Sequence, residues 1–419
     1  MKRRRKIAVA LVALLLLSQA PFAYRSYRLW QLGAAVDELN ARRVPALPGE
    51  APFKEYVGVF HVHSFLGGHS KGTLEEIVRA AKSERLDFVL MTEHPQPQID
   101  TAAATLRGFH DGVLFVGGSE LVASDGGRLF VVPGVAAPDR NPPLQELVTR
   151  AKSEERLAVV GYPEEVRNPL PTGFDGIEVY NLYTNAKRIN YATMLFDGLW
   201  SYWGRPELLF ARFYERPAEN LRRWDEYNAS GAGRAYAFAG NDAHANVGWD
   251  WQDEDGRKVF DFKLDPYERS FRLVRIHVYD DRDFYNARGG DGEEPYDEQY
   301  LLGALRRGNF YLAFDVFGDP NGFSFTAAAT RGSESWQAVM GGEIPLPPDG
   351  EVRLKVTLPV QARTVFYRDG QVVHEVPDAT RAYLIVKQKG VYRVEVYLDQ
   401  LGSLLEGKPW IISNPIFVR

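Results

Sequence analysis

Histidine and carboxylate side chains recur in short polar motifs that follow apolar runs. His61-Val62-His63-Ser64 follows one such run, and Thr92-Glu93-His94 follows another. Further along, Gly118-Ser119-Glu120 and Asn241-Asp242-Ala243-His244 stand in similar positions. Neutral imidazoles and carboxylates are the ligand set for zinc, manganese or iron. The residues that could hold metal are therefore His61, His63, His69, His94, Glu120, Asp242 and His244.

The spacing of His61 and His63 constrains the backbone that carries them. Successive side chains alternate between the two faces of a regular strand, and residues at every second position share one face. His61 and His63 are two positions apart, so both imidazoles can face one metal. We expect this motif to lie at a strand end or bulge at the mouth of a barrel.

Composition narrows the possible functions. The chain has 419 residues, 45% of them hydrophobic and 13% aromatic, which is enough for a sizeable core and more than one domain. Its formal net charge of −5 argues against a nucleic-acid partner, because nucleic-acid binders usually carry excess positive charge. The chain has no cysteine, so it has neither disulfides nor thiolate metal sites.

The N-terminus has the pattern of an export signal or membrane anchor. Five cations lie within residues 2–6 and precede an apolar run from Ile7 to Leu17. Ser18 and Ala20 have the spacing of a cleavage site, but Pro21 would follow the cut. We expect an uncleaved anchor over residues 1–23, a stalk over 24–52, and a body exported to the cell envelope.

Residues 53–310 alternate short apolar runs with amphipathic ones, which predicts strand–helix units around a barrel of parallel strands. One predicted helix spans Leu74 to Ser83, with Thr73 as its N-cap. A strand is predicted from Arg272 to Tyr279. Residues 185–230 form a helical insertion, either a hairpin packed on the barrel or a lid over the substrate. Residues 311–419 alternate apolar and polar residues between turns, which predicts an antiparallel β-sandwich.

The order of these motifs resembles the PHP (polymerase and histidinol phosphatase) superfamily of metal-dependent phosphoesterases. The resemblance runs from Tyr56 to Phe310 and rests on the four motifs quoted above. It implies an α/β fold with a distorted (β/α)7 barrel. The closing residues 410–416 resemble the last strand of a β-sandwich that one exported branch of the superfamily carries.

The resemblance also implies how metals are divided among the ligands. His61, His63, Glu120 and Asp242 would hold one ion, and His69, His94 and His244 a second. Glu120 would bridge the first ion to a third. The two histidines usual for that third ion are replaced by Arg128 and Tyr162, and a guanidinium does not bind cations. We therefore expect two divalent ions of zinc, manganese or iron.

Two interpretations of the replacements remain open. Arg128 could clamp a phosphate oxygen, with Tyr162 donating a hydrogen bond, or the site could have lost its activity. On the first interpretation Asp242, Glu120 and Arg128 are catalytic. Asn181 then contacts substrate or caps a turn, and Lys71 attracts an anion or is a solvated loop residue.

The expected function is a metal-dependent phosphoesterase acting on a phosphorylated small molecule or envelope component. The competing function is a binding module that keeps metal for structure alone. Glu93 is expected to orient His94 rather than to bind metal. His110, His277 and His374 have no surrounding motif and are interpreted as structural or exposed.

Overall fold

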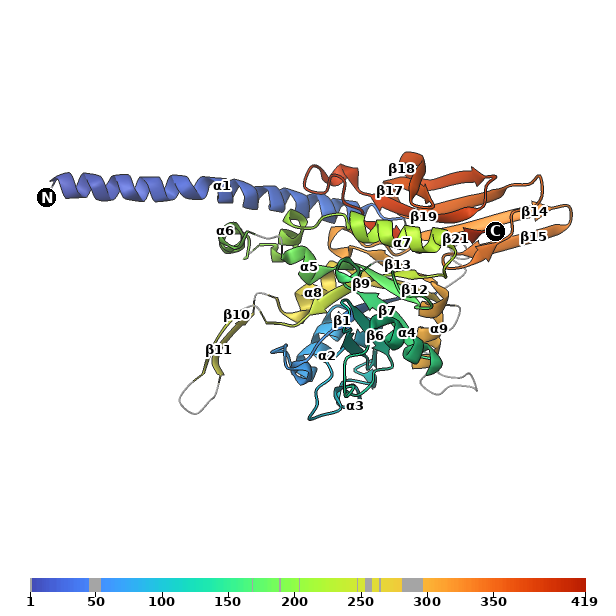
Figure 1. Cartoon of the computed structure of the whole chain (residues 1–419). Coiled ribbons are helices and arrows are strands. Elements are labelled where there is room, and N and C mark those ends of the chain that lie inside the picture. The colour runs from blue at the N-terminus through green and yellow to red at the C-terminus, as the bar shows by residue number, and fades with distance from the viewer. Residues whose placement is uncertain are drawn as a thin grey trace.

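A computed structural model describes residues 2–44, 54–167, 169–187, 190–202, 204–246, 248–252, 258–263, 265–280 and 297–419 (Figure 1). The last residues of the predicted stalk, 45–52, lie outside these ranges. The chain is a mixed α/β protein with one large sheet and one apolar N-terminal helix.

The first half of the body is built around a ring of paired strands. β1 pairs in parallel with β2 and β9, and β8 pairs in parallel with β7 and β9. β2 pairs in parallel with β4, and a bridge between Glu93 and Ser119 joins the end of β2 to β5. β6 runs antiparallel to both β5 and β7, so the pairings return to β1. The strands are β1 (Lys54–Val62), β2 (Phe88–Met91), β4 (Val113–Val116), β5 (Ser119–Val122), β6 (Arg128–Val132), β7 (Leu157–Gly161), β8 (Gly176–Asn181) and β9 (Tyr236–Ala243).

Helices and short strands connect the members of this ring. The predicted helix with Thr73 as N-cap is confirmed, because α2 spans Leu74–Ser83 and Thr73 forms a reciprocal capping box with Glu76. Within the predicted helical region 185–230, the described residues include α6, η3 and α7. The remaining elements are α3 (Thr101–Ala104), β3 (Gly108–His110), α4 (Leu144–Ser153), α5 (Leu182–Ala186), α6 (Tyr191–Ser201), η3 (Pro206–Arg212), α7 (Ala218–Ser230), β10 (Gly248–Gln252), β11 (Lys258–Lys263), α8 (Tyr267–Leu273) and α9 (Glu298–Arg307).

The strand predicted from Arg272 begins later than expected. Helix α8 runs to Leu273, and strand β12 (Arg275–Asp280) starts after it. Tyr267 and Phe271 lie one helical turn apart and are both buried, so helical spacing lets this segment bury its aromatic residues.

The large sheet continues from the ring into the C-terminal part. β12 pairs antiparallel with the first half of β1 and with β13 (Phe310–Ala313), and β13 pairs with β20. The predicted boundary at residue 310 therefore falls within a strand that is paired on both sides. The other strands are β14 (Ser324–Arg331), β15 (Glu334–Val339), β16 (Glu343–Ile344), β17 (Val352–Arg368), β18 (Gln371–Val386), β19 (Gly390–Tyr397), β20 (Ile411–Ser413) and β21 (Ile416–Val418).

Helix α1 (Lys2–Ala41) is longer than the predicted anchor and replaces most of the predicted stalk. Leu29, Leu32, Val36 and Leu39 lie on one face of the helix and are buried against the body. The preceding apolar part is exposed, and Figure 1 shows it extending alone from the body. By length and composition α1 could cross a membrane or serve as a signal.

A buried ion-pair network ties the helical region to the C-terminal strands. Arg393 on β19 is 1% exposed and donates to Asp225 of α7 at 2.7 and 2.8 Å. It also donates to Glu395 at 2.7 Å, and Arg216 donates to the same carboxylate. Breaking a buried pair leaves an uncompensated charge in the interior.

A second buried group joins β1, β12 and the turn after β13. His277 approaches Glu55 at 2.8 Å through Nδ1 and Asp315 at 3.0 Å through Nε2. Burial disfavours the charged imidazole, but the two carboxylates outweigh burial and raise the pKa of His277 to about 9. His277 is therefore a structural cation at neutral pH.

We predict that Arg393→Ala lowers the free energy of unfolding by about 3–5 kcal/mol, because Asp225 and Glu395 lose their shared partner. Arg150→Ala is the control, since Arg150 pairs with Glu154 on the surface of α4 and its loss is expected to cost below about 1 kcal/mol. Urea denaturation of both variants measures the difference. Equal losses would contradict the assigned role.

We predict that the unfolding free energy falls by about 3 kcal/mol as pH rises from about 6 to about 10, because each pKa unit corresponds to about 1.4 kcal/mol. The raised folded pKa of His277 means that this stability is complete below the unfolded pKa, near 6.5, and is lost as pH passes about 9. His277→Gln is expected to remove that part of the pH dependence. A variant whose urea midpoints follow the wild-type pH profile would exclude this assignment.

Candidate metal centre

The predicted irregularity in β1 is present at His61. Pairing of β1 with both β2 and β9 shifts register between Phe60 and Val62, and His61 has φ 68°. The two imidazole centroids lie 5.0 Å apart. The bulge expected at this motif is therefore present.

Two further residues of the site adopt left-handed backbone conformations. Asp242, at the end of β9, has φ 45°, and Tyr162, after β7, has φ 48°. For residues other than glycine this conformation costs on the order of 1 kcal/mol and tends to persist where a functional arrangement needs it. Strained backbone at His61, Tyr162 and Asp242 therefore marks one rim of the ring.

One group of ligand atoms surrounds a pair of carboxylates. His61 Nε2 lies 3.1 Å from Glu120 Oε2 and 3.3 Å from Asp242 Oδ1. His63 Nε2 lies 3.2 and 3.7 Å from the same two oxygens. All four side chains are buried. The residues that the resemblance assigns to a first metal are thus brought together.

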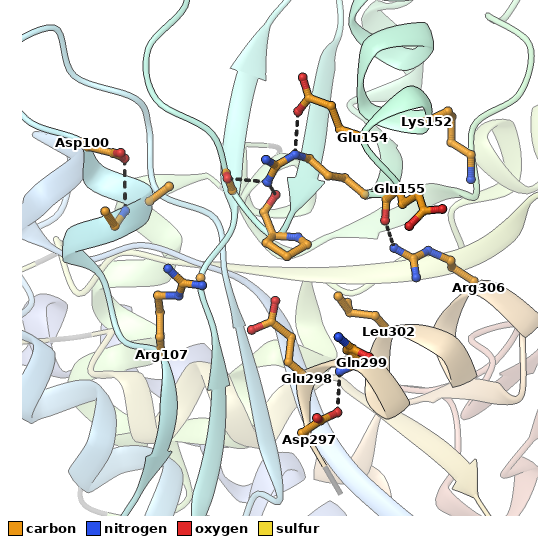
Figure 2. A pocket seen from close by; sticks show the side chains of 16 residues that line it. Asp100, Arg107, Lys152, Glu154, Glu155, Asp297, Glu298, Gln299, Leu302 and Arg306 are labelled. Carbon is orange, nitrogen blue, oxygen red and sulfur yellow. Dashed lines mark hydrogen bonds and ion pairs between the residues drawn. The ribbon is translucent and has the colours of Figure 1, made fainter.

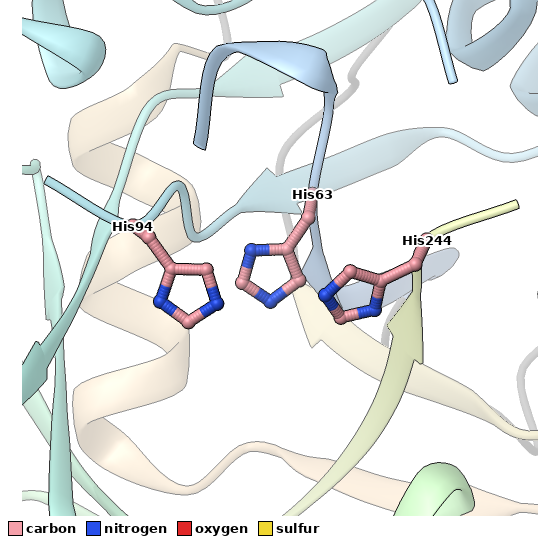
Figure 3. Close-up of side chains that lie close together, drawn as sticks. All are labelled: His63, His94 and His244. Atoms are coloured by element: carbon pink, nitrogen blue, oxygen red, sulfur yellow. The ribbon is translucent and has the colours of Figure 1, made fainter. Parts of the chain in front are cut away.

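A second group consists of His63, His94 and His244, whose ligand nitrogens lie within 4.8 Å of one another. Figure 3 shows the three rings side by side, each from a different segment. The ring of His63 is stacked between the other two, at centroid distances of 4.6 and 4.3 Å. His69 is exposed on its loop, with its ring centroid 4.8 Å from that of His94. His63 therefore stands between both groups, which sequence order alone does not indicate.

The charge states of the imidazoles suit metal binding. Burial lowers the pKa of His63 to about 3 and that of His94 to about 4, so both rings are neutral near pH 7 and can offer a nitrogen lone pair. Burial also opposes charge on His61, but Asp242, Glu178 and Glu120 raise its pKa well above the usual value. The three carboxylates therefore favour a positive charge at this point in the structure.

His63 supplies the strongest indication that a ligand belongs here. The side chain is fully buried, and neither ring nitrogen makes a hydrogen bond of good geometry with the residues that the structure describes, although Nε2 lies 3.2 Å from Glu120 Oε2. Buried polar atoms are rarely left without a partner. A cation between His63 and the neighbouring carboxylates would satisfy one nitrogen and balance their charge, so the residues present fit a divalent metal.

Arg128 and Tyr162 occupy one side of the same cluster. The Arg128 guanidinium pairs with Glu120, and the Tyr162 hydroxyl donates to Asp242 Oδ2 at 2.8 Å. The guanidinium lies over the Tyr162 ring, 4.5 Å from its centroid, while 31% of the Arg128 side chain remains exposed. Burial, aided by neighbouring carboxylates, raises the pKa of Tyr162, which keeps the phenol a hydrogen-bond donor.

Supporting residues hold the ligands in place. Glu178 Oε1 lies 2.6 Å from His61 Nδ1, an outer contact of the kind that orients ligating histidines. Gly240 permits this approach, because a Cβ there would lie 1.8 Å from the Glu178 carboxylate. The role of Glu178 was not anticipated, although an acidic residue within the apolar strand Gly176–Asn181 is a signal that could have indicated it.

Three other expectations can be compared with the structure. Asn181 caps α5 by accepting from Thr184, which confirms the suggested cap, and it also donates to Asp242 at 3.3 Å. Lys71 is exposed on the His69 loop. Glu93 accepts from the backbone of Ser64 and from Thr105 rather than contacting the His94 ring, so it fixes the turn after His63.

A separate cavity, of about 1160 Å³, is lined by residues of α3, α4 and α9 and of neighbouring loops (Figure 2). Its cations already have partners: Arg156 binds Glu154 and two backbone carbonyls, Arg306 binds the carbonyl of Glu155, and Lys152 pairs with Asp175. Arg107 lies near Glu298 across the cavity. None of the candidate metal ligands lines this cavity. The candidate chemistry therefore belongs to the cluster of histidines and carboxylates.

No family model matches the chain, and a search of curated proteins finds no match. Among solved structures, the chain is similar to a two-domain protein from Bacteroides vulgatus, described as containing a predicted PHP-like metal-dependent phosphoesterase, with 14% identity and a TM-score of 0.37 over 89% of this chain and 97% of that one. It is also similar to PsfC from Pseudomonas syringae, with 13% identity and a TM-score of 0.31 over 62% and 92%. Likenesses at this level identify neither fold nor activity.

We predict that His63→Gln removes most of the bound divalent metal, because His63 belongs to both groups of ligands. Glu178→Gln, which only alters the support of His61, is expected to weaken metal binding by about 10- to 100-fold. Elemental analysis and competition with a chelating dye measure the two effects. His374→Gln is the control, since His374 is exposed on β18. Wild-type metal content in His63→Gln would contradict the site.

Proposed function

We propose that the chain is a PHP-type metal-dependent phosphoesterase, with a barrel domain and a C-terminal β-sandwich. The observation that carries the proposal is the buried convergence of His63 with neighbouring imidazoles and the carboxylates of Glu120 and Asp242. This donor set, at a rim where several strands of the ring end, supports binding of zinc, manganese or iron.

His61, His63, Glu120 and Asp242 would hold one ion, and His94 and His244, with His69 from its loop, a second. Divalent ions in such a site activate water and neutralise the charge of a phosphoryl group under attack. His244 Nδ1 lies 2.9 Å from the backbone carbonyl of Asp242, so Nδ1 carries the proton and Nε2 is left to bind metal.

Arg128 is proposed to replace the third ion of the superfamily. Its guanidinium compensates Glu120, and its partly exposed edge retains donors that a phosphoryl oxygen can accept. Tyr162 remains protonated and holds Asp242 in place through its hydroxyl. Asn181 fixes the other side of the Asp242 carboxylate. These residues position substrate and ligands without themselves forming a covalent intermediate.

The proposed substrate class is a phosphorylated small molecule or envelope component, reached from the outer face of a membrane in which α1 is anchored. The apolar first half of α1 supports the anchor. The buried second half of the same helix supports its retention, because removal of residues before Pro21 would cut a continuous helix.

A second candidate is a binding module that holds metal without turnover. It is favoured by the contacts of Arg128 and Tyr162, which already compensate one oxygen of Glu120 and one of Asp242. A site adjusted in this way could keep metal for structure alone.

We predict that the full chain, loaded with manganese or zinc, hydrolyses members of a panel of phosphomonoesters and phosphodiesters. Asp242→Asn is expected to abolish turnover, and Arg128→Lys to lower kcat/KM by about 10-fold, because lysine keeps the charge but loses the planar fork. His374→Gln should retain full activity. Stoichiometric metal without turnover of any ester would reject the phosphoesterase and leave the binding module.

A further inference from the structure

Helix α6 carries an apolar face that the rest of the described chain covers only in part. Leu195, Phe196, Leu199 and Trp200 are 50%, 36%, 61% and 46% exposed. Their positions differ by one, four and five residues, so they form one continuous stripe along the helix. A stripe of this size on a soluble surface marks a site of interaction with a protein or a membrane.

The one charged residue of α6 points away from Leu195 and Leu199. Asp197 is 2% exposed and accepts from Arg25 of α1 at 2.8 and 3.1 Å, with Arg212 of η3 at 3.7 Å. The ion pair fixes how α6 is rotated against α1, and this rotation turns Leu195 and Leu199 outward, with Phe196 and Trp200 at the edge of the contact. The exposure of the two leucines is therefore imposed by a buried contact on the opposite side of the helix.

α6 lies beside the part of α1 that follows the apolar run Ile7 to Leu17 (Figure 1). Trp200 donates to Gln19 at 3.3 Å, and the rings of Phe196 and Phe22 lie 5.0 Å apart. Ser26 donates to the backbone carbonyl of Trp200 at 3.0 Å. The contact between the two helices thus covers residues 19–26 of α1.

The length of α1 relates this contact to the thickness of a bilayer. A helix rises about 1.5 Å per residue, so a hydrocarbon core of roughly 30 Å needs about 20 residues. Counted from the cation cluster that ends at Lys6, the far boundary of the core falls close to Ser26. α6 therefore lies at the level where the apolar core gives way to lipid headgroups.

We propose that α6 is an interfacial helix whose face of Leu195, Phe196, Leu199 and Trp200 inserts into the outer boundary of the bilayer beside α1. The inference goes beyond the phosphoesterase and rests only on α1 being a membrane anchor. Exposed Tyr24, Tyr27 and Trp30 on α1 extend the same aromatic belt, which is typical of a membrane–water boundary. Two adjacent helices at the interface would restrict rotation of the body about α1.

The absence of cysteine from the chain permits a direct test with single spin labels. Leu199→Cys reports on α6, Leu14→Cys on the apolar half of α1, and Ile385→Cys on an exposed apolar residue of β18 (51% exposed). Each full-length variant is labelled and reconstituted into phosphatidylcholine–phosphatidylglycerol vesicles. Accessibility to oxygen, which partitions into lipid, is compared with accessibility to a water-soluble nickel complex.

The expected result is a several-fold higher oxygen-to-nickel ratio at Leu199 and Leu14 than at Ile385. A lipid-exposed Leu14 with a water-exposed Leu199 would overturn the inference about α6 and leave the anchor standing. A water-exposed Leu14 would overturn the anchor and the inference with it, whereas neither result affects hydrolysis by the metal centre. Dipolar broadening between labels at Leu199, lost on dilution with unlabelled protein, would show that a second copy covers the face and would also overturn the inference.

Discussion

The compensation of two buried carboxylates is the constraint on which the rest of the site depends. Glu120 and Asp242 are almost inaccessible to solvent, and a carboxylate in that environment is costly unless positive charge or donors surround it. The bulge at His61 and the left-handed backbone at Asp242 accompany the approach of His61 to these oxygens, and Gly240 leaves room for Glu178 beside His61. Local strain in two strands is offset by electrostatics at their common rim.

The topology of the ring explains how residues from such different positions meet there. Most site residues follow parallel strands and therefore lie at carboxyl ends. β6 runs antiparallel, so its first residue, Arg128, reaches the same rim, opposite Gly161 and next to Tyr162. A guanidinium and a phenol that are distant in sequence thus become neighbours on one side of the two carboxylates. Because β6 runs in the opposite direction, the Arg128 guanidinium lies beside the candidate metal ligands.

The sequence predicted those features that depend on local spacing. The His-x-His motif indicated a strand end or bulge, and Thr73 with Glu76 marked the start of α2; both features are local. The sharing of His63 between two groups, the contact of Glu178 with His61 and the burial of His277 between Glu55 and Asp315 depend on strands brought together by folding. No short-range pattern encodes these contacts, since each partner lies more than one element away.

The predicted stalk shows why composition alone was misleading at the N-terminus. Arg25 and Arg28 suggested solvated chain, but Arg25 pairs with buried Asp197 and Arg28 donates to Ser403. Leu29, Leu32, Val36 and Leu39 on the same helix are buried. A segment with many arginines therefore becomes a packed helix through partners that lie far along the chain. Because α1 contacts both α6 and the turn that holds Ser403, its orientation is fixed against both regions. The helical region and the C-terminal part of the chain are therefore linked through contacts of one continuous helix rather than through a flexible tether.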